Sequence, residues 1–454
     1  MLEHDLELTP DRQFVRWGRE NKLHPRNWPF LRKCYDTGLV CFLDLIVFLL
    51  GQVVGTIVFP PWSEAFGRKR LYVLSSGLSS VCCVVVGVTD SIAAVVIGRV
   101  LGGFLAAIPY TVGSGSIEDM WNSRERIWVF FFWTIASNIG LCVGPIIGTF
   151  VTASLSWRWV FYIYAMIIGA ATVLFFFMRE SRPALLLARE VEKMCRETGE
   201  KLEALNHDHM PEFRSFVRMA LFRPAALFVK EPLVLVIALM IAFAFGLLYI
   251  FTEALQPIYE SMGFSTTHSS LAFVAIATGI WFSSLTRILD FWILDNLHRK
   301  GQPVKPEHKL AGLAIGAPVL AISMWWFGWT IPPHVQGVHW IVPTIPLAMM
   351  GYSLNEFDTV LYGYLGDSYL SYSASATAAV AFLRALLSGV FPLFTNIMFR
   401  DLTPNVAMSV LAALATVFCA APLLFIRYGE RIRARSKFAK HSLQIQAEIG
   451  NKDL

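Results

Sequence analysis

Four ionisable residues stand out because they lie inside long apolar stretches, where a charge needs a function or a partner. They are Asp44, Arg99, Glu356 and Arg384. A charged side chain at the centre of a bilayer costs about 2.5–3.5 kcal/mol on insertion scales. A carboxylate there can carry a proton, and a nearby arginine can tune the pKa at which that proton is released. The four residues are therefore candidates for proton coupling or for lining a substrate cavity.

The two arginines each have a structural alternative. Arg99 is flanked by Gly98, Gly102 and Gly103. Glycines let neighbouring helices approach, so the guanidinium either faces a wet cavity and a carboxylate or only donates hydrogen bonds between helices. Arg384 lies about eight residues into its apolar run. It either takes part in substrate binding or coupling, or extends toward the cytoplasmic interface.

Helix geometry limits the acidic candidates. Glu356 and Asp358 are two residues apart and point to different helix faces, so at most one is expected to face a cavity and the other to lie near the interface. Asp44 could carry a proton, but the direction in which its side chain points depends on a first span that is incomplete. Glu253 and Gln256 stand near the outer end of another run, where they either line an outward vestibule or cap that helix at the interface.

The elements that position these residues are predicted to be membrane-spanning helices. The chain has 454 residues, of which 55% are hydrophobic and only 16% charged, whereas soluble proteins carry about 25% charged residues. The apolar residues gather in runs of roughly 20, the length that crosses a bilayer as a helix. Eleven runs occur, at 38–59, 71–90, 92–113, 127–151, 158–178, 232–252, 269–289, 310–330, 338–362, 376–399 and 406–426.

The placement of lysine and arginine predicts which side each loop faces. Basic residues gather at 179–230, at 299–309 and in the C-terminal tail, which puts these segments in the cytoplasm. Counting back, the basic turn at 68–70 also lies inside, as should the basic N-terminal tail. Only 26 residues (34–59) separate that tail from Pro60, whereas two crossings and a turn need more than about 40. The first half is therefore one span short of the topology that its charges predict.

This pattern divides the chain into five parts. We expect a cytoplasmic N-terminal tail at 1–36, an N-terminal transmembrane bundle of about five spans at 37–178, a cytoplasmic central loop at 179–231, a C-terminal six-span bundle at 232–426 and a basic cytoplasmic tail at 427–454. The predicted fold class is an all-α polytopic membrane protein.

Four sequence patterns then suggest a family. They are SEAFGRKR, IGRVLGG, GLCVGPIIGT, and the closing pair YLGDSYLSYSASATAA and RYGERIRARSKFA. In this order they resemble the motifs of the major facilitator superfamily, most closely its fungal twelve-span drug:proton antiporters, over nearly all of residues 24–440. The resemblance implies two helical-bundle halves around a central cavity, with about eleven helices here where the family has twelve. An internal loss that fuses the start of the first span to the end of the second would explain the difference.

The resemblance also assigns roles to residues. Arg99 matches the family's arginine motif, and Arg384 matches a family arginine. The cytoplasmic turn supplies a possible latch between adjacent helices, made of Glu64, Gly67, Arg68 and Arg70. The antiporter signature supplies a gating or packing element, made of Gly140, Gly144, Pro145 and Gly148. The three glycines recur every four residues and form a smooth face, and the proline bends the helix, so this segment either seals one side of the cavity or only packs tightly.

The remaining features exclude other classes. We find no enzyme, cofactor or metal motif, and the basic residues flank membrane spans, so no nucleic-acid partner is expected. The resemblance implies proton-driven export of a small organic compound by a monomer in the plasma membrane, with the vacuolar membrane as an alternative site. A proton-coupled importer or polyamine carrier of the same fold, and a remnant that inserts without transporting, remain as alternatives.

Overall fold

The structure, a computed structural model, describes residues 6–8, 15–17, 48, 51–60, 62–63, 66–120, 126–182, 185–186, 192–193, 195–197, 199, 223–301, 305–335, 337–369, 373–436 and 438. It divides into two units, residues 1–47 and residues 48–454. In the first unit, strand β1 (Leu6–Leu8) pairs antiparallel with β2 (Val15–Trp17). Asp44 and Glu64, two of the predicted site residues, lie outside the described residues.

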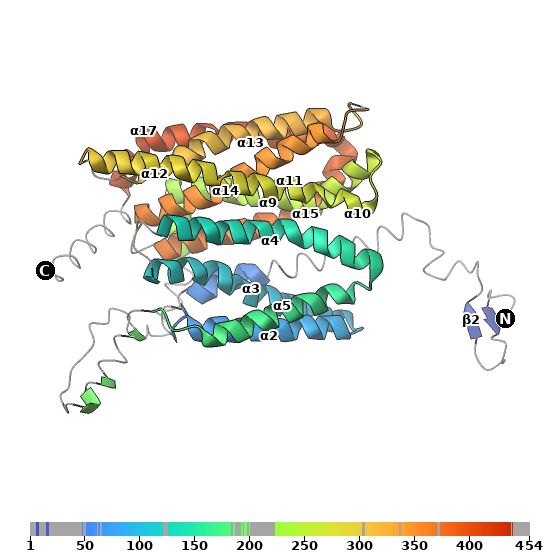
Figure 1. Ribbon diagram of the computed structural model, residues 1–454, viewed down its shortest axis with the longest axis horizontal. Helices are drawn as coiled ribbons and strands as arrows, with labels where there is room; N and C mark the ends of the chain where they lie inside the picture. Colours follow the sequence, from blue (N-terminus) through green and yellow to red (C-terminus); the bar gives the residue numbers. More distant parts are fainter. Residues whose placement is uncertain are drawn as a thin grey trace. The chain divides into compact units, whose positions relative to one another are not determined.

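The second unit consists of long helices that run side by side (Figure 1). The helices of its first half are a short apolar helix at Gly51–Pro60, α2 (Lys69–Val88), α3 (Ile92–Met120), α4 (Arg126–Ser154) and α5 (Arg158–Phe177). The short helix α8 (Arg223–Lys230) leads into the second half. The elements of that half are α9 (Pro232–Ser261), α10 (Thr266–Ser269), α11 (Ala272–Phe282), α12 (Ser284–Arg299), the 3-10 helix η4 (Pro306–Lys309), α13 (Ala311–Thr330), α14 (Ile341–Tyr369), α15 (Ser373–Leu402), α16 (Pro404–Phe418) and α17 (Ala420–Arg435).

These helices match the predicted spans. Nine helical segments among the described residues are long and apolar enough to cross a membrane, with α10–α12 forming one segment and α16–α17 another. Helix α14 corresponds to a tenth run but carries Asn355, Glu356 and Asp358 in its middle, and all three are buried by neighbouring helices. By contrast, Leu174 and Phe177 of α5 are exposed, as expected of side chains that face lipid. The all-α prediction for the spanning region is confirmed.

The two halves pack their helices in the same order. Helix α2 contacts α3 and α5, just as α13 contacts α14 and α16. A close glycine contact is repeated as well. A side chain at Gly51 would overlap the backbone carbonyl of Val100 in α3, and one at Gly279 in α11 would overlap the carbonyl of Ala348 in α14. The helix at 51–60 therefore occupies the second position of its half, as α11 does in the other half.

One helix of the second half lacks a described counterpart. Helix α9 packs along α15, closely enough that a side chain at Gly246 would overlap the Phe391 ring. By position, the counterpart of α15 in the first half is α4. No described atom lies within 4 Å of where a side chain would begin at Gly140, Gly144 or Gly148 of α4. Most residues before position 51 lie outside the described residues, so the predicted one-span difference between the halves stays a prediction.

Several helices are longer than the apolar runs that predicted them. Helix α3 continues to Met120, α14 to Tyr369 and α17 to Arg435. The predicted end of the last span at residue 426 is therefore nine residues early as a helix boundary. Apolar runs report the hydrocarbon thickness, whereas a helix continues into the interface wherever its backbone remains hydrogen-bonded.

Candidate functional site

Three charged side chains meet in the interior of the second half, and we call them the buried charge cluster: Arg287, Asp290 and Glu356. Arg287 Nη1 lies 2.7 Å from Asp290 Oδ2, and Arg287 Nη2 donates to Glu356 Oε2. The three side chains are only 4%, 5% and 0% exposed, respectively. Helix α12 supplies Arg287 and Asp290 one turn apart, and α14 supplies Glu356. The cluster thus ties two membrane helices together through charge.

A glycine on a third helix makes room for this cluster. A side chain at Gly312 of α13 would overlap both Glu356 Oε2 and Arg287 Nη2. One turn further, a side chain at Gly316 would lie 3.0 Å from Glu356 Cβ, which is tighter than ordinary contact. The α13 backbone therefore covers the ion pair directly, and only glycine at position 312 leaves space for it.

The charges in this cluster do not balance. It contains two carboxylates and one guanidinium, so it carries one net negative charge when all three groups are ionised. Among the described residues, Glu356 Oε1, Asp290 Oδ1 and Arg287 Nε have no hydrogen-bond partner. Burying an unbalanced charge in a dry interior is costly. Binding of one proton to either carboxylate would make the cluster neutral.

Sequence analysis found only part of this cluster. Glu356 was a candidate, but Arg287 and Asp290 were missed because they lie at the end of the run at 269–289, where charges usually belong to the interface. The arginine and aspartate three residues apart were the available signal. Asp358, the second acid of this pair, is 1% exposed, so neighbouring helices cover it as they cover Glu356. Helix α14 is surrounded by other helices, so both of its faces are internal.

A small cavity lies between the two halves. It has a volume of about 130 Å³ and is lined by Gln52, Ser137, Leu141, Phe245, Tyr249, Arg384, Ala385 and Ser388. The Arg384 guanidinium lies 4.3 Å from the centre of the Phe245 ring, a cation–π distance. Arg384 is buried, and its side chain forms part of the wall of this cavity. We call this space the central cavity.

Polar side chains connect the halves beside the buried charge cluster. Asn138 of α4 donates to Asn355 Oδ1 of α14 at 3.0 Å, and Asn355 Nδ2 donates to Ser283 Oγ at 2.8 Å. The hydroxyls of Thr134 and Thr359 are 2.9 Å apart on the same pair of helices. Asn355 is the residue before Glu356. These hydrogen bonds therefore join α4 to the helix that carries the acid.

Arg99 lies in the first half between two aromatic rings. Its guanidinium carbon is 5.0 Å from the centre of the Phe48 ring and 5.3 Å from that of Phe161 in α5. Arg99 is half-buried. Stacking of this kind suits the planar arginine head better than a lysine. The structure does not bring Arg99 together with Glu356 or Arg384 among the contacts of the described residues.

The basic turn before α2 has an acidic partner that sequence analysis missed. Glu180, just after α5, accepts backbone hydrogen bonds from Arg68 at 2.9 Å and from Lys69 at 3.1 Å. Its own neighbours Ser181 and Arg182 donate to it as well. Burial raises the pKa of Glu180, but these backbone N–H donors outweigh burial and hold that pKa below its usual value. The carboxylate therefore caps the start of α2.

The geometry of this turn explains two of its residues. Gly67 has a φ of +89° and packs directly on the Glu180 carboxylate, so only glycine fits without strain. The Arg68 side chain is buried and its Nη1 lies 3.4 Å from the Val112 carbonyl of α3. Arg70 is exposed on the first turn of α2. The turn thus joins α2, α3 and the end of α5, and its predicted contact with Glu64 stays a prediction.

The second half has a matching set of contacts at the end that its basic residues predict to be cytoplasmic. Glu307 in η4 accepts two hydrogen bonds from Arg433 Nη2, at 2.6 Å and 2.7 Å, and lies 3.3 Å from the Tyr364 hydroxyl. Glu231 accepts from Ser436 at 2.8 Å and from the Tyr369 hydroxyl at 3.1 Å. The end of α17 is therefore fastened to α14, to η4 and to the start of α9.

The predicted gating or packing element lies on α4. Pro145 lies inside α4 as predicted, and the three glycines share one side of that helix. Since no described atom packs against the glycines, their role in sealing the cavity stays a prediction.

A polytopic helical protein with two similar halves, a cavity between them and charges in its core is built as a secondary transporter. Comparison with known proteins agrees. The family model described as Major Facilitator Superfamily matches residues 36–392, and the chain belongs to this superfamily. Its members are transporters and not enzymes.

Individual relatives give more detail. The chain is 28% identical to the multidrug transporter TPO1_2 of Candida glabrata, over 93% of this chain and 79% of that protein. It is 30% identical to the MFS-type transporter hepF of Aspergillus oryzae, over 88% and 82%. Among solved structures, the proton:xylose symporter XylE superposes with a TM-score of 0.63 at 15% identity, over 89% of this chain and 88% of that one. This last likeness shows the fold alone.

Proposed function

We propose that this protein exports a small organic compound from the cell, in exchange for protons, by alternating access at the plasma membrane. The relatives support the direction: they include a multidrug transporter from Candida glabrata and an efflux pump named radE from Floropilus chiversii. At about 130 Å³ the central cavity is smaller than the about 300–1,000 Å³ typical of small-molecule sites. It supports a substrate site because both halves line it and its walls combine aromatic, polar and cationic groups.

The observation that carries the proton coupling is the charge imbalance of the buried charge cluster. Two carboxylates share the single guanidinium of Arg287 in a dry interior. A proton is the smallest ligand that removes the imbalance, and Glu356 Oε1 and Asp290 Oδ1 are both available to receive it. Protonation of Glu356 weakens the attraction between Arg287 of α12 and α14, and deprotonation restores it, whereas Asp290 lies on the same helix as Arg287 and its protonation leaves that attraction in place. The cluster can therefore convert proton binding into helix movement.

Substrate and proton would be coupled through α14. The bonds from Asn138 and Thr134 join α4, which lines the central cavity through Ser137, to the residues on either side of Glu356. When substrate displaces α4, these bonds break or shift, and the environment of Glu356 changes with them. Coupling of this kind requires no direct contact between substrate and acid.

The test measures dye accumulation in yeast cells that lack their own drug exporters. Cells that produce the protein are loaded with the fluorescent cation rhodamine 6G, and Glu356→Gln is compared with the control Glu192→Gln, an exposed acid in the central loop. If the protein exports the dye, cells with the wild type or the control variant should accumulate less dye than cells without the protein. Cells with Glu356→Gln should accumulate as much dye as cells without the protein. Higher accumulation would favour an importer. No effect, beside an active version with a restored first span, would favour a transport-inactive remnant.

A further inference from the structure

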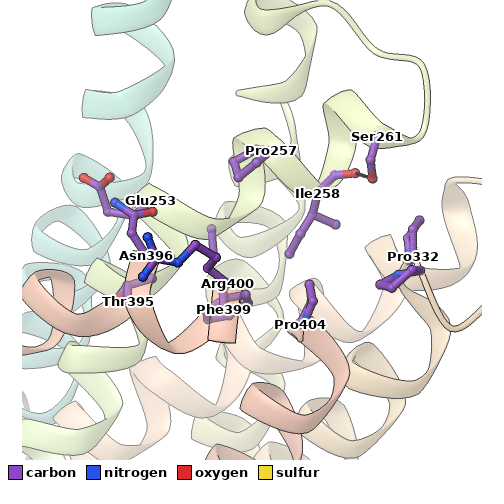
Figure 2. Close-up of a pocket in the computed structure, with 12 residues that line it drawn as sticks. Glu253, Pro257, Ile258, Ser261, Pro332, Thr395, Asn396, Phe399, Arg400 and Pro404 are labelled. Atoms are coloured by element: carbon purple, nitrogen blue, oxygen red, sulfur yellow. Dashed lines mark hydrogen bonds between the residues drawn. The ribbon is translucent and has the colours of Figure 1, made fainter. Parts of the chain in front are cut away.

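A second, larger cavity lies one helical turn beyond the central cavity along α9. It has a volume of about 360 Å³ and lies between α9, the turn at Pro332–Pro333, the end of α15 and the start of α16. Figure 2 shows its lining residues. This volume falls within the range of about 300–1,000 Å³ typical of small-molecule sites. We call it the outer pocket, because the adjoining loops lack lysine and arginine and are therefore predicted to face outward.

The outer pocket is lined by one carboxylate, that of Glu253. Figure 2 shows its side chain next to that of Asn396. Among the ion pairs of the described residues, Glu253 has none. The cation at the same pocket, Arg400, is paired with Asp401 at 2.9 Å. Glu253 is the acidic side chain of the lining, and its carboxylate is the group that would pair with a cation entering the pocket.

The rest of the lining is mostly apolar. Ala254, Pro257 and Ile258 contribute one wall and Phe399 and Pro404 another. The Ser261 hydroxyl is already used, since it donates to the Ile258 carbonyl at 2.6 Å. A ligand that fits must bury an apolar body against these residues and place a positive group at Glu253. Phe399 offers an aromatic face that would also attract a cation.

The outer pocket shares its helices with the central cavity. Tyr249 of the central cavity and Glu253 of the outer pocket are four residues apart on one face of α9. Ser388 and Thr395 are likewise two turns apart on one face of α15. The two cavities therefore follow one another along the same pair of helices toward the outer side.

We propose that the outer pocket is a binding site for small organic cations with an apolar body, held by Glu253. It is a second station, distinct from the central cavity, that a compound meets on the outer side of the membrane. This inference goes beyond the proposed export function, because the site would bind its ligand whether or not the chain completes a transport cycle.

The test is equilibrium binding to the full chain in lipid nanodiscs. The probe is radiolabelled 1-methyl-4-phenylpyridinium, a permanent cation with two flat rings. Glu253→Gln keeps the size and the Asn396 contact but removes the charge, and we expect about tenfold weaker binding, which corresponds to about 1.4 kcal/mol. Asn396→Asp adds a second carboxylate and should tighten binding several-fold.

The control is Glu260→Gln on the same helix. Glu260 is exposed, accepts from Gln256 at 3.1 Å and does not line the pocket, so its substitution should leave the dissociation constant unchanged. Wild-type protein that fails to bind the probe, or binding that Glu253→Gln leaves intact, would overturn the inference.

The outcome is independent of export. A chain that binds the probe through Glu253 but exports no dye would support the outer pocket and contradict the proposed function. A chain that exports dye, and whose probe binding depends on Arg384 and not on Glu253, would support the proposed function and contradict the outer pocket as the binding site.

Discussion

Substitutions in the buried charge cluster should differ in cost according to the charge they leave behind. Arg287→Met removes the only cation and leaves Asp290 and Glu356, both at most 5% exposed, facing each other without compensation. Glu356→Gln instead leaves the Arg287–Asp290 pair, whose atoms are 2.7 Å apart and whose charges balance. The glutamine oxygen can still accept a hydrogen bond from Arg287. The arginine substitution should therefore be far more destabilising.

The magnitude follows from the burial of the three groups. Leaving a buried charge without its partner typically costs about 3–5 kcal/mol, whereas replacing a charged acceptor by a neutral one that keeps the bond costs about 1 kcal/mol. In a bundle of 150–250 residues, each kcal/mol lowers the Tm by about 2–4 °C. We expect a drop of about 6–20 °C for Arg287→Met and of about 2–4 °C for Glu356→Gln.

Thermal unfolding of purified protein, followed by intrinsic tryptophan fluorescence, measures these drops. Asp290→Asn is a second comparison. It leaves the Arg287–Glu356 pair, whose charges balance, so its drop in Tm should be similar to that of Glu356→Gln. Equal drops for Arg287→Met and the two acid substitutions would refute the charge argument, and would mean that packing and not charge decides the stability of this cluster.

Three further predictions concern other contacts. Gly312→Ala should abolish dye export, because the added methyl group would overlap the Arg287–Glu356 pair. Gly363→Ala is the control, since its methyl group meets no described atom within 4 Å, and it should leave export unchanged. Export by Gly312→Ala at the wild-type rate would contradict the close packing. Glu180→Gln should lower the Tm at pH 7. The pKa of Glu180 in the folded protein lies below its unfolded value of 4.5, so the ionised carboxylate stabilises the protein above pH 4.5. This stabilisation is lost as the pH falls through the folded pKa. The difference in Tm between the variant and the wild type should therefore disappear in acid. Arg433→Gln should slow transport, because it releases α17 from Glu307. Arg435→Gln, at an exposed residue, is the matched control. Equal transport rates for the two variants would count against a role for the Arg433–Glu307 contact.

Sequence analysis predicted the fold well, because the bilayer requires long apolar helices and leaves few alternatives. The charges alone also predict a first half that is one span short, which stays a prediction. Glu356 and Arg384 were chosen as candidates because a charge in the middle of an apolar run is conspicuous. Both are buried, and Arg384 lines the central cavity.

The remaining site residues depend on contacts between distant segments. Nothing near Gly312 in the sequence indicates that it covers an ion pair between α12 and α14. Glu180 lies more than 100 residues from Arg68 and resembles an ordinary loop acid until the two meet. Glu356 and Asp358 point to different faces of α14, and helical spacing does not show that other helices cover both faces.

The most direct test of the account is proton movement driven by substrate. Protein reconstituted into liposomes that contain the pH-sensitive dye pyranine is exposed to rhodamine 6G at zero membrane potential. The account predicts a substrate-dependent pH change with wild-type protein that vanishes with both Glu356→Gln and Asp290→Asn. Substrate movement without any pH change, or a pH change that survives both substitutions, would contradict the claim that the buried charge cluster carries the proton.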